Sequence, residues 1–203
     1  MIKKIILFFL LIIPLFCSAQ LKDSVKVKTS IFEIIYSETL ESPLHVKYNV
    51  TCTNGLISRS GMNFHTDSIV HTSDDKDYAD NRFDKGHMAP AADFNCSKET
   101  LEMTFTYLNC ALQDQGLNRL TWRLLESKER ELAKKYTVTV EITVDVNKKC
   151  EKLPTGAYVP KGFYKTIYIK ETKQVLKYYM PNIKPVYSDP EKYRIKWFNL
   201  KTY

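Results

Sequence analysis

The stretch LNRLTWRLLESKERELAKKYTVTVEITVDV, residues 117–146, contains two hydrophobic patterns of different period. Leucines recur at helical spacing in its first part, which predicts a helix from about Leu117 to Lys135. The expected buried stripe of this helix consists of Leu117, Leu120, Leu124, Leu125 and Leu132. Polar and apolar residues then alternate through TVTVEITVDV, residues 137–146, which predicts a half-buried strand. A long helix should therefore lead directly into a strand.

Further strands are expected on both sides of this stretch. Four segments are rich in β-branched and aromatic residues: IFEIIY (31–36), HVKYNVTC (45–52), FYKTIYIK (163–170) and VLKYYM (175–180). Residues 21–30 look like a polar lead-in, TNG at 53–55 predicts a turn, and the segment 56–86 is polar and loop-like. The order of strands, long loop, helix and strands indicates an α+β domain with an antiparallel sheet.

The N-terminal stretch MIKKIILFFLLIIPLFCSAQ has two lysines, an apolar run and a small-residue end, which is the pattern of a secretory signal peptide. We expect a signal peptide at 1–19, cleaved near Ala19, and one domain at 20–203. This is preferred to a lipoprotein attached through Cys17, because bulky Phe16 precedes that cysteine. No other apolar run is long enough to cross a bilayer, so no stable membrane insertion is expected. The resulting expectation is an exported protein, periplasmic or extracellular.

The net charge indicates the kind of binding partner, and the cysteines bear on disulfide bonds and on a zinc site. The formal net charge is +7, and +5 without Lys3 and Lys4, which suits a polyanionic partner. Four cysteines follow the N-terminal stretch, namely Cys52, Cys96, Cys110 and Cys150. They allow three disulfide pairings that the sequence does not separate, or buried free thiols. Because none forms a CxxC arrangement, a structural zinc site has little support.

Two groups of residues could carry chemistry. Asn118, Trp122 and Glu126 lie at i, i+4 and i+8 on one flank of the predicted helix. The amide oxygen of Asn118 and the carboxylate of Glu126 are hard ligands for an ion such as Mg²⁺. The structural alternative is a helix-start asparagine and a surface glutamate paired with Arg130. In RFDKGHMAPAADFN, residues 82–95, His87 could be a general base with a pKa near working pH. The alternative is a histidine that only makes structural hydrogen bonds.

Together these segments resemble the DNA/RNA non-specific endonucleases of the ββα-metal superfamily. The resemblance rests on DKGHMAPAADF (84–94) and FTYLNCALQDQGLNRLTWRLLE (105–126), with further matches at FHTD (64–67), YVPKGFYK (158–165) and YMPN (179–182). The family signature is Asp-Arg-Gly-His, a Ser-Asn pair, a Gln, an Asn and Trp-x-x-Leu-Glu. The positions that match it are Asp84, Gly86, His87, Asn109, Gln113, Asn118, Trp122, Leu125 and Glu126.

The resemblance implies a metal-assisted hydrolytic site within this α+β fold. Asn118 would be the one direct protein ligand of a largely hydrated Mg²⁺, for which Mn²⁺ can substitute, and Glu126 would hold the ion through water. His87 would be the general base, and Asn109 would orient it by a hydrogen bond. Asp84 would brace the loop.

The resemblance also implies a cation near the scissile phosphate, for which Arg59 and Lys85 are the candidates. The substrates would be DNA and RNA, cut with little sequence preference because the contacts are to phosphate. A homodimer and an inhibitor or immunity protein are left open as partners.

Lys85 is the main departure, because the family has arginine before Gly-His and lysine lacks the planar fork that binds phosphate at two points. The Thr-Gly-Pro that often follows the family's helix is also absent. These departures keep open a nucleic-acid-binding module with the same fold but weak or lost catalysis. A third hypothesis is a disulfide-rich adhesion or structural protein. It would not explain the double motif, that is, the two stretches 84–94 and 105–126, whose match to the family would then be a coincidence.

Overall fold

Residues 23–196 are described by the computed structural model, and a six-stranded antiparallel sheet is its largest element. The strands lie in the order β1-β2-β3-β6-β7-β8. They are β1 (Ser24–Lys28), β2 (Phe32–Ser37), β3 (Ser42–Asn49), β6 (Val138–Asp145), β7 (Gly162–Ile169) and β8 (Gln174–Pro181). Two three-stranded meanders are thus joined by antiparallel pairing of β3 with β6. A short turn, η5 (Pro190–Tyr193), follows β8.

The alternation in residues 137–146 places one face of β6 in the core. Val138, Val140, Ile142 and Val144 are buried, whereas Thr143 between them is exposed. Because successive strand side chains point to opposite faces, this one strand fixes which face of the sheet is covered. The predicted strand is confirmed.

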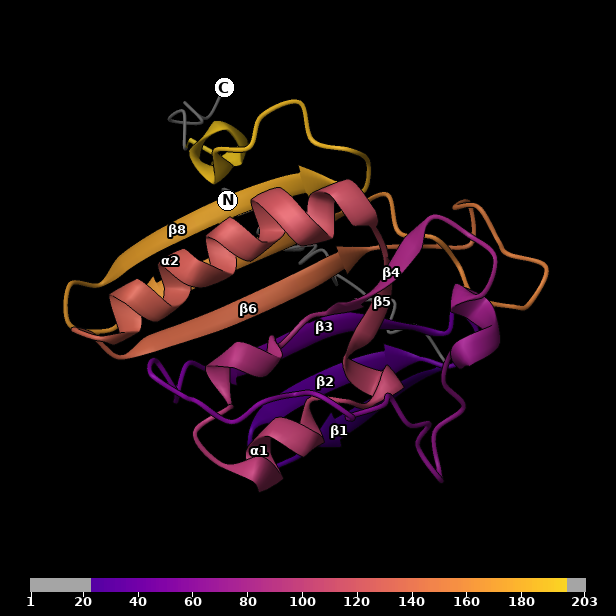
Figure 1. The fold of residues 1–203 in the computed structure, drawn as a ribbon. Coiled ribbons are helices and arrows are strands. Elements are labelled where there is room, and N and C mark those ends of the chain that lie inside the picture. Colours follow the sequence, from indigo (N-terminus) through magenta and orange to yellow (C-terminus); the bar gives the residue numbers. More distant parts are fainter. Residues whose placement is uncertain (1–22, 197–203) are drawn as a thin grey trace, which may run out of the picture.

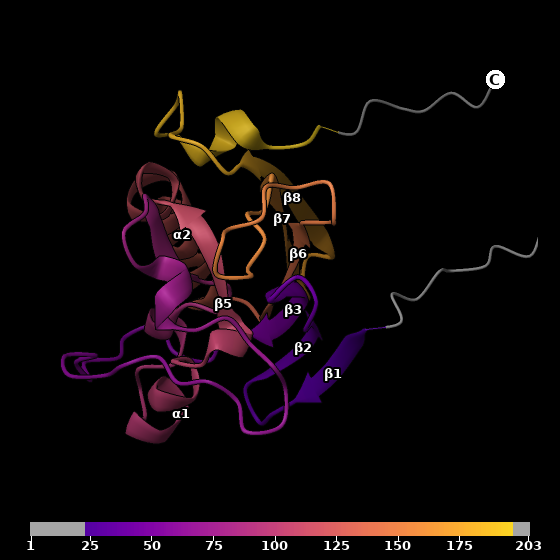
Figure 2. The same cartoon turned by 90° about the vertical axis from the view of Figure 1, so that its right-hand side faces the viewer.

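All the helices between β3 and β6 lie on that covered face, so the molecule has two layers, seen edge-on in Figure 2. The elements of this second layer are η1 (Asp75–Tyr78), β4 (Phe83–His87), η2 (Ala91–Asp93), α1 (Lys98–Met103), η3 (Tyr107–Asn109), β5 (Cys110–Asp114), η4 (Leu117–Trp122) and α2 (Arg123–Ala133). Strands β4 and β5 form a separate antiparallel ribbon, and α2 crosses the sheet beside β6 and β8 (Figure 1). The ribbon followed by this helix is a ββα unit, so the α+β prediction is confirmed.

The predicted leucine stripe of the helix is partly wrong. Leu117 and Leu125 are buried, but Leu120 is 42% exposed and Leu124 is 38% exposed. The helix begins with the π-helical segment η4, whose wider turns shift the phase of the side chains that follow. Trp122 and Glu129 occupy the buried face instead.

Three strands were not expected from the sequence. Residues 24–28 form edge strand β1 rather than a polar lead-in, because their backbone pairs along β2 while Lys26 and Lys28 alternate with Val25 and Val27. Strands β4 and β5 have five residues each and few β-branched side chains, so their propensity signal is weak. Their pairing depends on contacts with the rest of the second layer.

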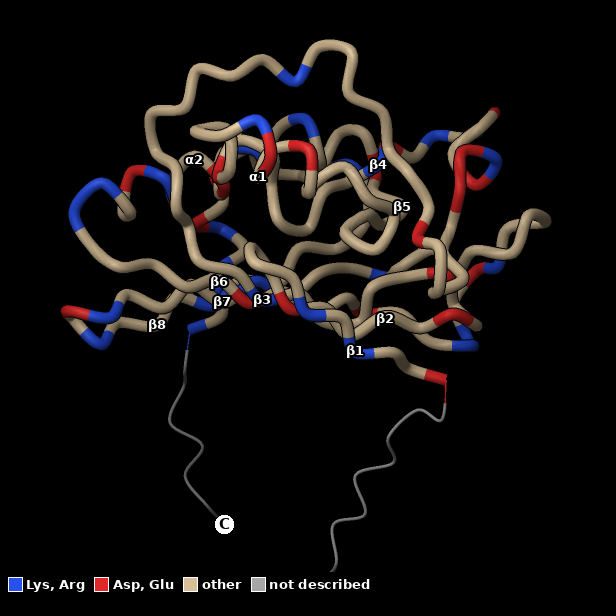
Figure 3. Tube along the Cα trace, turned by 90° about the horizontal axis from the view of Figure 1, so that it is seen from below, with Lys and Arg blue, Asp and Glu red and all other residues tan. Residues whose placement is uncertain are grey.

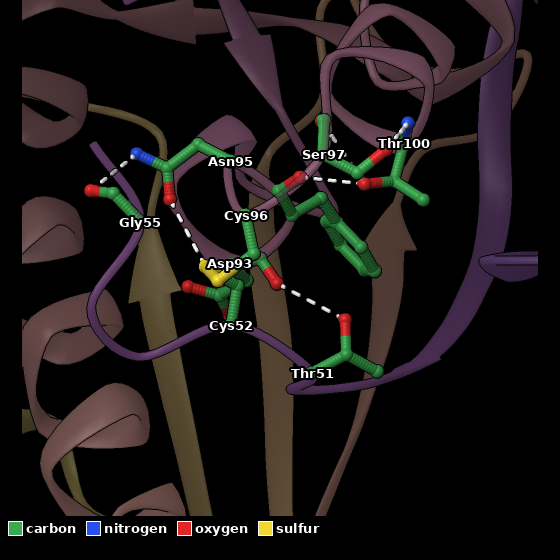
Figure 4. The surroundings of a disulfide bond; sticks show 9 residues. Thr51, Cys52, Gly55, Asp93, Asn95, Cys96, Ser97 and Thr100 are labelled. Carbon is green, nitrogen blue, oxygen red and sulfur yellow. Dashed lines mark hydrogen bonds between the residues drawn. A yellow bond between two sulfur atoms is a disulfide. The ribbon is translucent and has the colours of Figure 1, made fainter. Parts of the chain in front are cut away.

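Cys52 and Cys96 form a disulfide, which selects one of the three pairings left open by the sequence (Figure 4). Cys110 and Cys150 are free thiols. The disulfide joins the end of the β3 segment to the segment that follows η2. Asn95 reinforces this link, since its side-chain Nδ2 donates to Gly55 O at 3.1 Å and its backbone carbonyl accepts from Ile57 N at 3.3 Å. The loop of residues 55–64 is therefore anchored at its start.

Within residues 23–196, no helix is long and apolar enough to span a bilayer. The predicted signal peptide at 1–19 lies outside the described residues.

Replacing Cys52 and Cys96 together with serine should lower the free energy of unfolding by up to about 4 kcal/mol. The bond closes a segment with a sequence separation of 44, and opening it raises the chain entropy of the unfolded state. Urea denaturation measures the change. Cys150→Ser is the matched control and should keep the stabilising bond. Dithiothreitol should destabilise the wild type and the control but not the double variant; equal sensitivity of all three proteins would contradict the assignment.

Candidate active site

A cleft of about 910 Å³ opens between the 55–64 loop, strand β4 and the η4–α2 helix. Its polar lining includes Arg59, Asp84, Lys85, His87, Asn95, Asn118, Arg119, Arg123, Glu126 and Arg130. Its apolar lining includes Ile57, Met62, Phe64, Leu101 and Phe105. All the predicted site residues except Asn109 line this cleft.

His87 is the last residue of β4, and its ring is held by aromatic neighbours. The ring centroid lies 4.7 Å from that of Phe64 and 5.0 Å from that of Phe105. Burial lowers the pKa of His87 to about 3, and the nearby charge of Arg59 adds to the effect. The imidazole is therefore neutral at pH 7. Its Nε2 atom is buried and has no hydrogen-bond partner within residues 23–196. One of the two ring nitrogens of a neutral imidazole carries no proton and can accept one.

Gly86, next to His87, is required by the packing of the β4–β5 ribbon. A Cβ atom at this position would lie 2.4 Å from Oε1 and 2.6 Å from Cβ of Gln113. Gln113 is fully buried on β5, and so it has little room to move aside. The glycine of the Gly-His pair thus lets β5 approach β4 and sets the position of His87.

Asn118 is oriented by Asp84 across the ββα unit. Its Nδ2 donates a hydrogen bond of 2.9 Å to Asp84 Oδ2. Arg119 binds the same carboxylate at two points, with distances of 2.8 and 2.7 Å. Desolvation alone would raise the pKa of Asp84, but these partners outweigh it and lower the pKa, so the group is ionised. Because an ionised carboxylate only accepts hydrogen bonds, the amide nitrogen of Asn118 must face it and Oδ1 is left for another ligand.

Glu126 lies two turns beyond Asn118 on the same helix and lines the same cleft. Burial raises the pKa of its carboxyl to about 7, with Lys165 opposing the shift and Glu129 adding to it. Arg130 does not pair with Glu126, because its guanidinium donates to Asp93 at 2.8 Å. The surface ion pair considered from the sequence is therefore not formed.

A buried ion pair lies beneath this part of the helix. Lys165 of β7 and Glu129 of α2 are both fully buried and pair with each other, and Tyr48 donates to Glu129 at 2.7 Å. The Lys165 ammonium is also 4.3 Å from the centroid of the Trp122 ring. These contacts tie the helix to the sheet directly below Glu126.

The donor set of the cleft fits a largely hydrated dication. Within residues 23–196, no group of three His, Cys, Asp or Glu side chains is placed to hold a metal ion. The available donors are the Asn118 amide oxygen and the Glu126 carboxylate, which are hard oxygen ligands. Magnesium usually keeps several waters and takes few protein ligands, so a sparse oxygen site of this kind suits it.

Asn109 lies away from the cleft and does not orient His87 as the resemblance implied. It is fully buried, and its Nδ2 donates to Ala89 O at 2.9 Å and to Thr104 O at 3.0 Å. Its Oδ1 accepts from Ala89 N at 2.8 Å. The side-chain amide is thus bound to the backbone of Ala89 and Thr104. Asn109 therefore supports the backbone next to His87 rather than the imidazole ring.

The two predicted phosphate-binding cations differ in their surroundings. Arg59 is exposed on the 55–64 loop, and no carboxylate within residues 23–196 pairs with it. Lys85 forms an ion pair with Asp75, and its ammonium lies 5.3 Å from the Tyr107 ring centroid. Tyr107 also donates to Asp75 at 2.5 Å.

The sequence reasoning missed Asp75, Arg119 and Arg123. Asp75 comes from a distant turn, and no sequence pattern signals its contact with Lys85. Arg123 could have been found from its spacing, since it lies three residues before Glu126 and so shares that helix face.

A ribbon carrying a histidine, followed by a helix carrying an amide and a carboxylate that face one cleft, defines a ββα-type site. Residues 16–203 match the DNA/RNA non-specific endonuclease family. The chain therefore belongs to the DNA/RNA non-specific endonuclease family.

Individual relatives are similar over part of their length. Mitochondrial endonuclease G from Bos taurus is 37% identical over 82 residues, covering 39% of this chain and 27% of the relative. A nuclease from Syncephalastrum racemosum is 36% identical over 85 residues, covering 40% and 27%. The chain thus spans about a quarter of the length of these relatives. A chain of the crystal structure of the EndoG/EndoGI complex, described as showing the mechanism of EndoG inhibition, superposes with a TM-score of 0.75 at 25% identity, covering 84% of this chain and 80% of that one.

The expectation of export is wrong by this comparison. Relatives from Bos taurus, Homo sapiens, Danio rerio and two yeasts are named as mitochondrial nucleases. The prediction rested on the composition of residues 1–19 alone, and the folded domain shared with these relatives carries no physical signal for export.

The pKa of His87 predicts a pH-dependent loss of stability. The unfolded chain takes up a proton near pH 6.5, but the folded chain does so only near pH 3, so the unfolded state is favoured as the pH falls through this window. Relative to His87→Gln, the wild type should lose up to about 1.4 kcal/mol of unfolding free energy per pH unit below 6.5. Urea denaturation at several pH values measures the difference, in which the other titrating groups cancel. Parallel pH curves for the two proteins would contradict the buried, neutral imidazole.

Proposed function

We propose that this chain is a Mg²⁺-dependent endonuclease that hydrolyses phosphodiester bonds in DNA and RNA. The observation that carries the proposal is the convergence of a neutral histidine, a freed amide oxygen and a buried carboxylate on one cleft. His87, Asn118 and Glu126 come from β4, η4 and α2, and each lines that cleft. Family membership supports the same reaction.

In this proposal His87 is the general base. Its neutral ring would accept a proton from the attacking water, because its low pKa keeps one ring nitrogen unprotonated at neutral pH. The approach of a phosphate anion would raise the pKa of the imidazole and strengthen it as a base. The aromatic contacts with Phe64 and Phe105 fix the direction of the ring.

Asn118 and Glu126 would hold the dication, Asn118 directly and Glu126 through water. When bound, the ion would stabilise the charge that develops on the phosphate and on the departing oxygen. Asp84 keeps the Asn118 oxygen turned away from itself, and the buried Lys165–Glu129 pair supports the helix under Glu126. The residues thus provide a prearranged oxygen site beside the base.

Arg59 would supply positive charge to the scissile phosphate from the 55–64 loop. Contacts of this kind bind the sugar-phosphate backbone and carry no base information, so weak sequence preference follows. Basic and acidic positions are interspersed over both layers in Figure 3, and affinity would therefore depend on the cations of the cleft rather than on a broad basic face.

The second candidate is a nucleic-acid-binding module with weak catalysis. Lys85 stands at the position of the arginine in the family signature. Its ammonium is paired with Asp75, so less of its charge is available to bind a phosphate. A homodimer and a protein inhibitor stay predictions for this chain.

Digestion of plasmid DNA and ribosomal RNA tests the proposal. Wild type with Mg²⁺ should degrade both, and EDTA should stop the reaction. His87→Ala and Asn118→Ala should each lower the rate by at least about a hundredfold, because one removes the base and the other the direct ligand. His71→Ala and Asn147→Ala are matched controls at exposed positions and should cut at the wild-type rate.

Circular dichroism should show that all four variants are folded. Cutting by His87→Ala at the wild-type rate would refute its role as the base. DNA that wild type retards in a Mg²⁺-containing gel but leaves intact would favour the binding module.

A further inference from the structure

One row of side chains on the helix faces the cleft and is mainly basic. It contains Arg119, Arg123, Glu126 and Arg130, spaced by four, three and four residues, which places them on one helical face. We propose that Arg123 binds a substrate phosphate neighbouring the scissile one. This inference rests on the proposed nuclease function and adds a binding residue that the family signature does not contain.

Three other cations of the cleft lining, Arg119, Arg130 and Lys85, have carboxylate partners. Arg119 is held by Asp84 at two points, with an Nη2–Oδ1 distance of 2.7 Å. Arg130 pairs with fully buried Asp93 at 2.8 Å, and Lys85 pairs with Asp75. Because each charge is already compensated, binding a phosphate would cost these residues an existing ion pair.

Arg123 has no such partner within residues 23–196, and the one hydrogen bond of its side chain there is to the backbone. Its Nε donates to the carbonyl of Arg119 at 3.1 Å. This bond holds the inner part of the guanidinium and leaves both terminal nitrogens free. A planar fork with two free nitrogens suits two-point binding of a phosphate.

The position of Arg123 selects a phosphate close to the reacting one. Arg123 precedes Glu126 by three residues, which is about 4.5 Å along a helix axis. Arg59, the other cleft cation without a carboxylate partner among the described residues, comes from the 55–64 loop. The two arginines would therefore contact the strand from separate elements.

The apolar part of the cleft lining leaves the basic row on the helix as the place where the sugar-phosphate backbone of a substrate would bind. Ile57, Met62 and Leu101 are apolar and offer no hydrogen bonds to a phosphate. A strand in the cleft would thus turn phosphates towards the helix row, with Arg59 as the cation on the loop side. Arg123 lines the cleft together with Asn118 and Glu126, and this position distinguishes it from a solvated arginine elsewhere on the surface.

Steady-state kinetics on a short single-stranded DNA oligonucleotide with Mg²⁺ tests the proposal at several salt concentrations. Arg123→Gln should raise KM about tenfold with kcat little changed, because a charged hydrogen bond to bound substrate is lost. The slope of log(kcat/KM) against log[salt] should become shallower by about one. Arg123→Lys should keep most of the salt slope, since it keeps the charge. Arg82→Gln removes an exposed arginine outside the cleft lining and should match the wild type.

Fluorescence anisotropy of the same oligonucleotide in EDTA measures binding without turnover. A shallower salt slope for Arg123→Gln in both assays supports the proposal. Unchanged KM and unchanged slopes, or a fall in kcat alone, would overturn it while leaving the nuclease function intact. If wild type binds but does not cut, the nuclease proposal fails and the anisotropy slopes still decide the role of Arg123. If wild type neither binds nor cuts, both proposals fail.

Discussion

The carboxylate of Asp84 is the contact on which the arrangement of the site depends. It lies on β4 and accepts hydrogen bonds from Asn118 and Arg119 at the start of the helix. One ionised group thus joins the ribbon that carries His87 to the helix that carries Glu126, and it also decides which atom of the Asn118 amide is left for a ligand. Replacing Asp84 would leave the half-buried Asn118 amide and Arg119 without their carboxylate partner, which is costly in a partly desolvated site.

Burial beneath and around the helix sets the electrostatics of the cleft. The paired Lys165 and Glu129 are fully buried, and a pair of this kind is stable only while both members remain. Above them, burial moves the pKa of Glu126 up to about 7, and burial among aromatic rings moves the pKa of His87 down to about 3. The same desolvation disfavours the charged form of both groups, so it has opposite effects on the pKa of an acid and of a base.

Only some of the cations behind the formal net charge of +7 are available in the cleft to bind a polyanion. Most are compensated locally by Asp75, Asp84 or Asp93. Arg59 and Arg123 are the cleft cations without a carboxylate partner in the described part of the chain. Affinity for a polyanion is therefore expected to depend on two side chains that composition alone does not distinguish.

The sequence by itself determined the strands with regular alternation, the helix near residues 117–135 and several of the residues that line the cleft. These features follow from local periodicity and from the order of residues in the double motif. The tertiary structure decided what depends on contacts through space: the β4–β5 ribbon, edge strand β1, the exposure of Leu120 and Leu124 and the Cys52–Cys96 pairing. It also decided that Asn109 supports backbone and that Lys85 is ion-paired. Each of these depends on a partner far away in the chain, and a local pattern carries no information about that partner.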